Sequence, residues 1–292
     1  MNAYRLVLVL FCSGLPGRAQ NAPFPYPPEM RDAKIEAYKT IGDGNLNLYI
    51  FNPAEGGARA GRAAIVFFFG GGWRNGSPAQ FETQCRHLAG LGMVAIAADY
   101  RVQSRHQSTV ADSDRDAKSA IRYVRANAAR LGIDPERIAA GGGSSGGQLA
   151  AFAGIVPGLD EPGENRAVSS RPNALVLFNP VVLLAAVAGD EELTRLSFRA
   201  VGQEELSPWH HVSKNAPPAI IFHGKADTTV PYATVEAFAK KMQAAGNRCE
   251  LVGFDGQAHG FFNYRPAGNP YYDETLRKTD EFLASLGYLK RK

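Results

Sequence analysis

The 292-residue sequence lacks most of the features that mark several large protein classes. Three cysteines are too few for a disulfide framework, and no apolar run reaches the about 20 residues that a membrane-spanning helix needs. Lys and Arg number 32 against 28 Asp and Glu and are scattered, so nucleic acid is not indicated as a partner. Repeats and low-complexity tracts are also missing. What remains is an ordinary globular composition with ample apolar material for a core.

The first 19 residues have the pattern of a secretory signal peptide. Arg5 supplies the positive charge, residues 6–11 (LVLVLF) a short apolar core, and residues 17–19 (GRA) a small-residue cleavage site. A disordered tail with a few apolar residues is the alternative. The pattern predicts a secreted or periplasmic protein from which residues 1–19 have been removed.

The cysteines are not predicted to meet. Cys12 would leave with the signal peptide, Cys85 falls in a predicted helix, and Cys249 stands at the start of a predicted strand. We therefore expect two reduced thiols in the mature chain, neither with a catalytic role.

A glycine-rich run at residues 141–148 (GGGSSGGQ) is the most informative stretch. It follows a short apolar segment and precedes a helix-like one, which is the strand–turn–helix layout of a nucleophile elbow. Side chains two residues either side of the serine would collide in so tight a turn. Two overlapping G-x-S-x-G matches centre on Ser144 and Ser145, and spacing alone does not separate them. A phosphate-binding Walker loop would need a lysine that this run lacks.

An upstream segment has the residues of a loop whose backbone can approach a ligand closely. The apolar run 63–69 (AAIVFFF) is typical of a strand buried on both faces of a parallel sheet. Three glycines follow it at residues 70–72, where the absence of Cβ atoms lets backbone N–H groups approach a ligand closely. A plain strand-to-helix turn is the alternative, but it explains one glycine better than three.

Two downstream segments contain residues that could activate a serine. A predicted strand leads into residues 223–231 (HGKADTTVP), which hold Asp227, and a later one leads into residues 255–262 (DGQAHGFF), which hold His259. A serine hydroxyl is a poor nucleophile until an imidazole takes its proton, and a carboxylate orients that imidazole and stabilises its cation. The three residue types therefore point to nucleophilic catalysis.

Together these segments resemble the α/β-hydrolase-fold serine esterases of the hormone-sensitive-lipase-like and bacterial acetyl(xylan) and feruloyl esterase kind. Their elbow, G-x-S-A-G-G-[NH]-L-A, matches residues 142–150 with Ser144 as the nucleophile. Their H-G-x-x-D-x-x-V-P and G-x-x-H-G-F segments imply Asp227 as the acid and His259 as the base. The order Ser, Asp, His is the one this fold uses. The resemblance extends from about Lys34 to the C-terminus.

The resemblance also implies an oxyanion hole. The family has H-G-G-G-[WF] after its strand, and its second and third glycines donate to the oxyanion, which implies Gly71 and Gly72 here. The backbone N–H of Ser145 is the implied third donor. Phe69 stands where the family has histidine, a residue that orders the loop and takes no part in the chemistry.

Other residues compete for the acid and base roles. His223 precedes Asp227 on the same loop, so one short segment would have to supply both partners, and we interpret His223 as structural. Glu250 and Asp255 are alternative acids, but both lie close to His259 in sequence and away from the expected loop.

No metal site or cofactor is expected. His210 and His211 have no cluster of acids or cysteines nearby, and adjacent histidines of a regular helix or strand cannot both face one ion.

Strands and helices alternate along the chain. The pattern predicts a single α/β domain over residues 20–292, with an eight-stranded, mostly parallel sheet and helices on both faces. Residues 183–218 interrupt the alternation between two strands, and we expect a small lid insertion there. The leader is too short for the two-helix cap of lipase-like relatives, so we expect an open site. Its predicted walls are Trp73 with Phe261 or Phe262, and plain core packing is the alternative for each ring.

The sequence therefore predicts a secreted serine carboxylesterase for short acyl esters. By analogy with the family, the favoured substrates are O-acetyl groups on plant polysaccharide such as xylan, and feruloyl esters are the near alternative. A prolyl-oligopeptidase-like peptidase has a similar elbow, but the three-glycine loop and the lack of a propeller argue against it. A non-catalytic binding protein of the same fold is the alternative from another class, and the intact Ser, Asp and His disfavour it.

Overall fold

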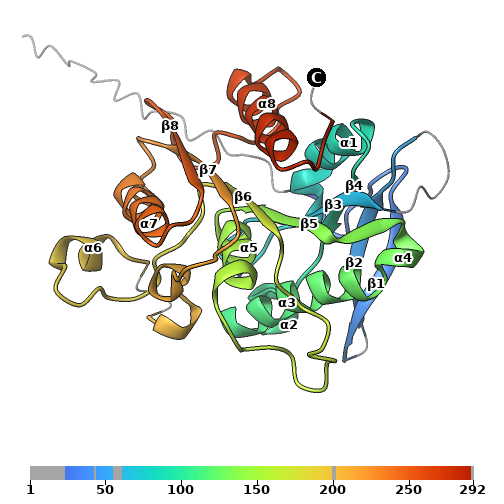
Figure 1. Ribbon diagram of the computed structural model, residues 1–292, viewed down its shortest axis with the longest axis horizontal. Coiled ribbons are helices and arrows are strands. Elements are labelled where there is room, and N and C mark those ends of the chain that lie inside the picture. Colours follow the sequence, from blue (N-terminus) through green and yellow to red (C-terminus); the bar gives the residue numbers. More distant parts are fainter. Residues whose placement is uncertain (1–23, 43, 55–60, 199–201, 291–292) are drawn as a thin grey trace, which may run out of the picture.

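The computed structural model describes residues 24–42, 44–54, 61–198 and 202–290, so the predicted signal peptide and Cys12 lie outside the described residues. Its centre is one eight-stranded sheet in the order β1-β2-β4-β3-β5-β6-β7-β8 (Figure 1). β2 is antiparallel to both β1 and β4, and all other neighbours are parallel, which confirms the predicted sheet. The strands are β1 Lys34–Ile41, β2 Gly44–Phe51, β3 Arg62–Phe68, β4 Val94–Ala98, β5 Ile133–Gly143, β6 Ala174–Phe178, β7 Ala219–Gly224 and β8 Cys249–Phe254.

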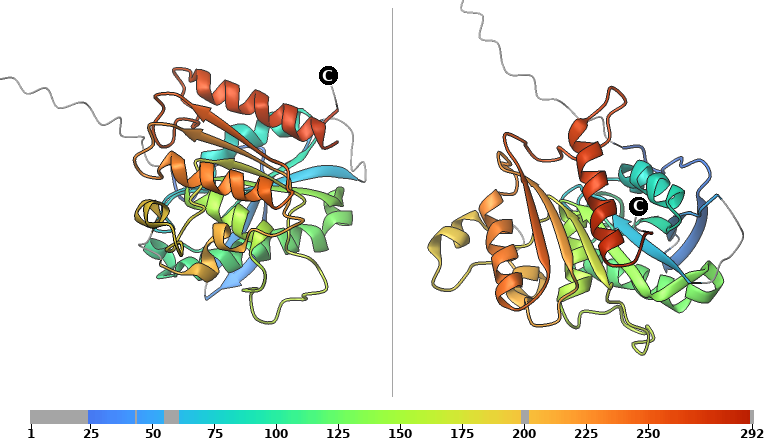
Figure 2. Two further views of the ribbon diagram at one scale, coloured as in Figure 1. Left: turned by 60° about the vertical axis from the view of Figure 1, so that its left-hand side comes forward. Right: turned by 45° about the horizontal axis from the view of Figure 1, so that its top comes forward.

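Helices cover both faces of this sheet. Helices α1 and α8 pack on one face, and α3, α5 and α7 on the other (Figures 1 and 2). The helices are α1 Glu82–Gly90, α2 Gln103–His106, α3 Val110–Ala126, α4 Ala128–Leu131, α5 Ser145–Ile155, α6 Glu191–Leu196, α7 Tyr232–Ala244 and α8 Pro270–Ser285, with 3₁₀ turns η1 Pro78–Phe81, η2 Glu204–Leu206 and η3 Pro208–His211.

The apolar run in β3 explains the three layers. Successive side chains of a strand point to opposite faces, and those of Val66 and Phe68 join the cluster of α3, α5 and α7. Those of Ile65 and Phe67 join the cluster of α1 and α8. Because both faces are covered, the strand must be apolar without alternation, as its sequence is.

The apolar spacing of residues 112–131 predicts one continuous helix, and this prediction is wrong in one respect, because the structure divides the segment into α3 and α4. α3 ends at Ala126, and Asn127 stands between it and α4 with φ −102° and ψ 13°. The Asn127 side chain donates to the carbonyl of Tyr123 at 2.9 Å. Asparagine competes for backbone groups in this way and so interrupts helices.

The segment predicted as a lid connects β6 to β7. It carries α6, η2 and η3, and α6 lies beside α7, at the left of Figure 1. Backbone hydrogen bonds tie it to its own start: Phe198 donates to Leu183, and Trp209 donates to Val182. Residues 199–201 of this segment lie outside the described residues.

Cys85 and Cys249 are both buried and free, as predicted. Burial raises the pKa of both thiols, that of Cys249 to about 12, so neither is a ready nucleophile. Within the described part of the chain, no helix combines the length and apolarity needed to cross a bilayer.

Candidate active site

Ser144 occupies a strained turn between β5 and α5. Its φ of 55° and ψ of −119° are unfavourable for a residue with a side chain. Three backbone hydrogen bonds hold it there: its N–H donates to Phe178, and its carbonyl accepts from Gln148 and Val181. Only Ser144 of the two candidate serines has this conformation, whereas Ser145 is the first residue of α5.

The glycines around Ser144 are required by close backbone contacts. A Cβ on Gly142 would lie 2.3 Å from the carbonyl oxygen of Gly146, and one on Gly146 would lie 2.1 Å from that of Phe68. Backbone atoms cannot yield as the end of a side chain can, so any larger residue would force the strand and helix apart.

Ser144, His259 and Asp227 meet at the carboxyl ends of three different strands. The Nε2 atom of His259 lies 2.9 Å from Ser144 Oγ, and its Nδ1 atom lies 2.7 Å from Asp227 Oδ2. Asp227 follows β7 and His259 follows β8, so the sheet brings together residues up to 115 positions apart. The structure thus assembles the three residues that the sequence placed in one site.

Asp227 is held as a carboxylate. Burial alone would raise its pKa, but hydrogen bonds from His223 and His259 and from backbone N–H groups bring that pKa well below the usual range. Its Oδ1 atom accepts from the N–H groups of Thr229 and Val230, both at 2.9 Å. The side chain is fully buried, so this charge depends on its partners.

This depressed pKa predicts acid-sensitive stability. A carboxyl whose pKa is lower in the folded than in the unfolded state, where it is about 3.9, contributes its full stability above that value. The contribution is lost as pH falls from about 5 through the folded pKa, because the unfolded chain binds the proton first. We expect the unfolding free energy of Asp227→Asn to fall less steeply than that of wild type between about pH 5 and 2.5 in urea titrations. Equal slopes would contradict this account.

His223 belongs to β7 and contacts the acid. Its buried ring donates from Nε2 to the carbonyl of Val230 at 2.8 Å, and the same atom lies 3.3 Å from Asp227 Oδ2. It therefore contacts the same carboxylate oxygen as His259 and has no contact with Ser144 by hydrogen bond, which agrees with a structural interpretation. The alternative acids are engaged elsewhere, since Asp255 pairs with Lys225 and Glu250 with Arg248.

The glycine loop after β3 bends back over the elbow. Gly71 has a φ of 142° and Gly72 one of 63°. The N–H of Gly72 donates to Ser145 Oγ at 3.0 Å in this structure, so its role as an oxyanion donor stays a prediction. No hydrogen bond among the described residues uses the N–H of Gly71 or Ser145. Ser145 thus contributes its hydroxyl as a tether for the loop in addition to a free backbone donor.

Phe69, which stands where relatives have histidine, is ordered by stacking. Its ring lies 4.1 Å from that of Tyr100, centroid to centroid, and is completely buried. The hydroxyl of Tyr100 donates to the carbonyl of Phe69 at 2.7 Å. Aromatic packing and this one hydrogen bond therefore hold the start of the loop.

A cavity of about 310 Å³ opens onto Ser144 and His259. Trp73 and Phe262 line it, as predicted. Phe261 does not line it: its ring packs 4.8 Å from that of Phe254, whereas Phe262, which belongs to the same core cluster, also borders the cavity. The sequence did not indicate the other side chains of the lining, which are Gln80, Asn179, Val181, Phe198, Thr229, Val230 and Asn263.

Gln148 anchors the tryptophan wall. Its Oε1 atom accepts from Trp73 Nε1 at 3.0 Å, and its Nε2 atom donates to Asp114 Oδ1 and to the carbonyl of Leu206. It stands at the [NH] position of the elbow pattern, a signal that could have marked it. One buried amide thus joins the oxyanion loop, α3 and the segment between β6 and β7.

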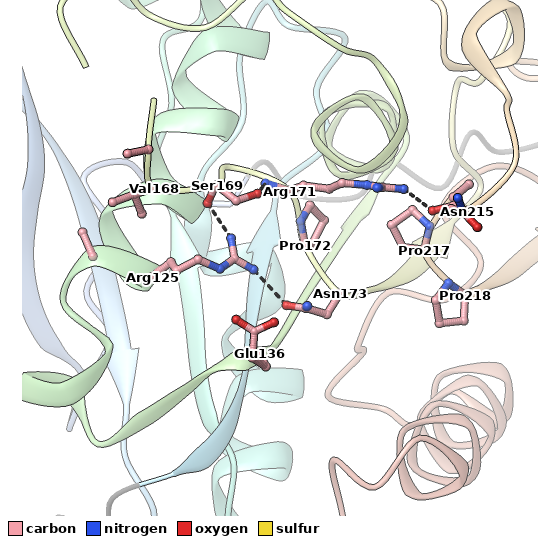
Figure 3. A pocket seen from close by; sticks show the side chains of 13 residues that line it. Arg125, Glu136, Val168, Ser169, Arg171, Pro172, Asn173, Asn215, Pro217 and Pro218 are labelled. Carbon is pink, nitrogen blue, oxygen red and sulfur yellow. Dashed lines mark hydrogen bonds between the residues drawn. The ribbon is translucent and has the colours of Figure 1, made fainter. Parts of the chain in front are cut away.

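A larger cavity, of about 710 Å³, lies away from these residues (Figure 3). It is bordered by Asn173 and Pro218, which precede β6 and β7, whereas Ser144 follows β5. Because these strands are parallel, this cavity lies at the amino ends of the strands and the cavity at Ser144 lies at their carboxyl ends. Arg125 donates to the carbonyl of Ser169 and Arg171 to that of Asn215, so their guanidinium groups hold loops together.

The adjacent histidines take separate partners. His210 contacts Ser207 Oγ through Nδ1, and His211 contacts the carbonyl of Glu204. Within the described ranges, no three His, Cys, Asp or Glu side chains are grouped so as to hold a metal ion.

The fold and the geometry at Ser144 define an α/β-hydrolase-fold protein. The comparisons agree, since the BD-FAE family model matches residues 48–242, and the chain belongs to that family. It is 28% identical to esterase LipC of Mycobacterium tuberculosis over 68% of this chain and 52% of that protein. It is also 28% identical to isoprenylcysteine alpha-carbonyl methylesterase ICME of Arabidopsis thaliana, over 73% of this chain and 53% of the relative. The chain spans about half the length of the curated relatives it matches.

A solved structure agrees over almost the whole fold. The apo form of Thermogutta terrifontis esterase 2 is 52% identical, with a TM-score of 0.87, and the match covers 92% of this chain and 100% of that one. The same esterase phosphorylated by paraoxon matches with 51% identity, a TM-score of 0.84 and the same coverage.

Proposed function

We propose that the protein is a serine carboxylesterase for short-chain acyl esters. The observation that carries this proposal is the continuous hydrogen-bonded path from Ser144 through His259 to Asp227 beside an open cavity. Relatives named as esterases and a similar esterase that reacts with paraoxon support it.

The first half-reaction follows from the hydrogen bonds. His259 Nε2 takes the proton of Ser144 as Oγ attacks the ester carbonyl, and Asp227 stabilises the resulting imidazolium. The carbonyl oxygen becomes negative and accepts from the free N–H groups of Gly71 and Ser145. The imidazolium then gives its proton to the alcohol oxygen as the C–O bond breaks, which leaves an acyl group on Ser144.

The second half-reaction repeats these roles with water. His259 takes a proton from water, the hydroxide oxygen attacks the acyl carbon, and the same two N–H groups receive the oxyanion. When the bond to Ser144 Oγ breaks, the imidazolium returns its proton to the serine. The products are a carboxylic acid and the regenerated hydroxyl.

The size of the cavity supports a short acyl group. Because His259 must reach the leaving oxygen, the alcohol lies beside it, which leaves Trp73, Val181 and Phe198 to surround the acyl chain. The similar esterase from Thermogutta terrifontis has been solved with propionate and with butyrate bound. A cavity of about 310 Å³ fits acids of that size.

Removal of the Phe198 ring should let the cavity accept longer acyl chains. Its half-buried ring lies 5.7 Å from that of Trp73 and borders the cavity. We expect Phe198→Ala to raise the ratio of kcat/KM for p-nitrophenyl octanoate to that for the acetate by roughly tenfold, since a few buried methylenes are worth that much. The control is Phe238→Leu, a change on the buried side of α7, which should leave the ratio unchanged. An unchanged ratio in Phe198→Ala would place the acyl chain elsewhere.

For the alcohol part we propose O-acetyl groups on plant polysaccharide such as xylan. An exported enzyme with an exposed site suits a bulky alcohol, and this step depends on family analogy. The test is release of acetate compared with ferulate from native acetylated xylan, beside p-nitrophenyl acetate and a dipeptidyl amide. Predominant ferulate release would favour a feruloyl esterase, and cleavage of the amide alone would favour a peptidase. Failure to react with a fluorophosphonate probe would favour a non-catalytic protein.

Export is proposed from the signal-like N-terminus. Expression of the full chain in a bacterial host, followed by N-terminal sequencing of the mature protein, tests it. A mature chain that begins near residue 20 supports export, and a chain that retains Met1 in the cytoplasmic fraction opposes it.

A further inference from the structure

Three side-chain amides border the cavity and join its two catalytic loops. Gln80 belongs to η1, which follows the glycine loop; Asn263 follows the loop of His259; and Asn179 follows β6. We call these three residues the amide chain. They stand outside every motif of the sequence and touch none of the three reacting side chains by hydrogen bond.

The amide chain is continuous from one loop to the other. Gly70 N–H donates to Gln80 Oε1 at 2.7 Å, and Gln80 Nε2 donates to Asn263 Oδ1 at 2.9 Å. Asn263 Nδ2 donates to the carbonyl of Gly260 at 2.9 Å. The N–H of Gly260 then donates to Asn179 Oδ1 at 3.0 Å.

The two central amides have one orientation each. The N–H of Gly70 can only donate, so it requires Gln80 Oε1, which turns Nε2 toward Asn263. Asn263 must then present Oδ1 to Gln80 and Nδ2 to the carbonyl of Gly260. Reversing either amide would place donor against donor and acceptor against acceptor. The amide chain therefore has one hydrogen-bonding arrangement, and neither amide can be flipped without loss of its hydrogen bonds.

Both ends of the link adjoin groups that the reaction uses. Gly70 lies against the elbow, since a Cβ there would be 3.3 Å from Ser144 Cβ, and it is followed by Gly71 with its free N–H. Gly260 follows His259 directly. The amide chain thus connects Gly70, beside the oxyanion donor Gly71, to Gly260, beside the base His259. This connection does not pass through Ser144.

We propose that Gln80 and Asn263 are positioning residues, which keep the Gly71 N–H and the His259 imidazole in register for the transition state. The proposal rests on the ester hydrolysis proposed above. Gly71 has no side chain to anchor it, and its carbonyl accepts from Arg74 and Asn75 of the same turn. The position of that turn over the elbow is therefore set by its two flanks, Gly70 through Gln80 and Gly72 through Ser145. Because a displacement of about 1 Å in such a group can reduce a rate by up to about a hundredfold, the link acts on kcat and leaves substrate binding intact.

The test uses variants of similar volume in the full chain. Gln80→Met and Asn263→Leu should each lower kcat for p-nitrophenyl acetate by roughly tenfold to a hundredfold, with KM changed by less than about threefold. A trifluoromethyl ketone, which occupies the oxyanion hole as an adduct of Ser144, should lose affinity by the same factor as kcat/KM. The kcat of the double variant should be no lower than that of the less active single variant, since one break already disconnects the two loops.

Matched controls separate this role from general stability. Asn247 is 8% exposed, as Asn263 is, and its Nδ2 donates to the carbonyl of Ser213, while Gln243 donates to that of Cys249. Asn247→Leu and Gln243→Met remove comparable hydrogen bonds of side-chain amides away from the cavity. They should lower the melting temperature by similar amounts but leave kcat unchanged.

The outcomes are distinct. Folded Gln80→Met and Asn263→Leu with kcat within twofold of wild type would overturn the proposal, as would additive losses in the double variant. Should Asn263→Leu not fold, Gln80→Asn, which is one methylene too short to reach both partners, carries the same test. If wild type itself neither hydrolyses the ester nor reacts with a fluorophosphonate, the proposed function fails and the inference falls with it; an active wild type with unaffected variants overturns the inference alone.

Discussion

Ser144→Ala should abolish ester hydrolysis, with a fall in kcat on the order of 10⁶, the scale seen when a serine protease loses its nucleophile. The reason is geometric. Of the two candidate serines, Ser144 has the positive φ that lifts its hydroxyl from the turn, and its Oγ lies 2.9 Å from His259 Nε2. The measurement is kcat for p-nitrophenyl acetate, with the mass of the protein after treatment with paraoxon. Wild type should gain one diethylphosphoryl group and Ser144→Ala none.

Ser145→Ala is the matched control for this prediction. It keeps the backbone N–H and removes only the hydroxyl that accepts from Gly72 at 3.0 Å. One such neutral hydrogen bond is worth about 1 kcal/mol, so kcat should fall by roughly tenfold or less. The reverse pattern, with Ser145→Ala inactive and Ser144→Ala active, would assign attack to the other serine.

Asp227→Asn should lower kcat by about 10⁴, as the equivalent change does in serine proteases. Asp227 Oδ1 accepts two backbone N–H groups, so an asparagine would keep its oxygen there and place its NH₂ at the Oδ2 position. That NH₂ would face His259 Nδ1 as a donor and force the imidazole to carry its proton on Nε2. In this tautomer Nε2 cannot accept the proton of Ser144.

The control for this variant is Asp255→Asn. Asp255 is an exposed carboxylate after β8 that pairs with Lys225, and its removal should leave kcat unchanged. Activity of Asp227→Asn above about a tenth of wild type, with the melting temperature preserved, would show that another group orients His259. His223 is in contact with the same carboxylate and would then be the first residue to examine.

The sequence predicted the fold and the reacting side chains because both depend on local patterns. Continuous apolar runs separated by amphipathic helices require a buried parallel sheet, whatever the details of packing. The elbow is local as well, since Gly142 and Gly146 are required by contacts within two residues of Ser144 and with β3. Asp227 and His259 each follow a strand, and the carboxyl ends of neighbouring parallel strands meet at one edge of the sheet.

The tertiary structure decided what depends on side-chain direction and on distant partners. Phe261 and Phe262 are equivalent in sequence, and both rings belong to the same core cluster, yet only Phe262 also borders the cavity. The hydrogen bond of Gly72 to Ser145 and the link of Gln80 to Asn263 join residues 73 and 183 positions apart. No local periodicity encodes such pairs, because the chain returns to them only after the whole sheet has formed. The identity of the chemical groups was therefore a property of the sequence, and their placement was a property of the folded sheet.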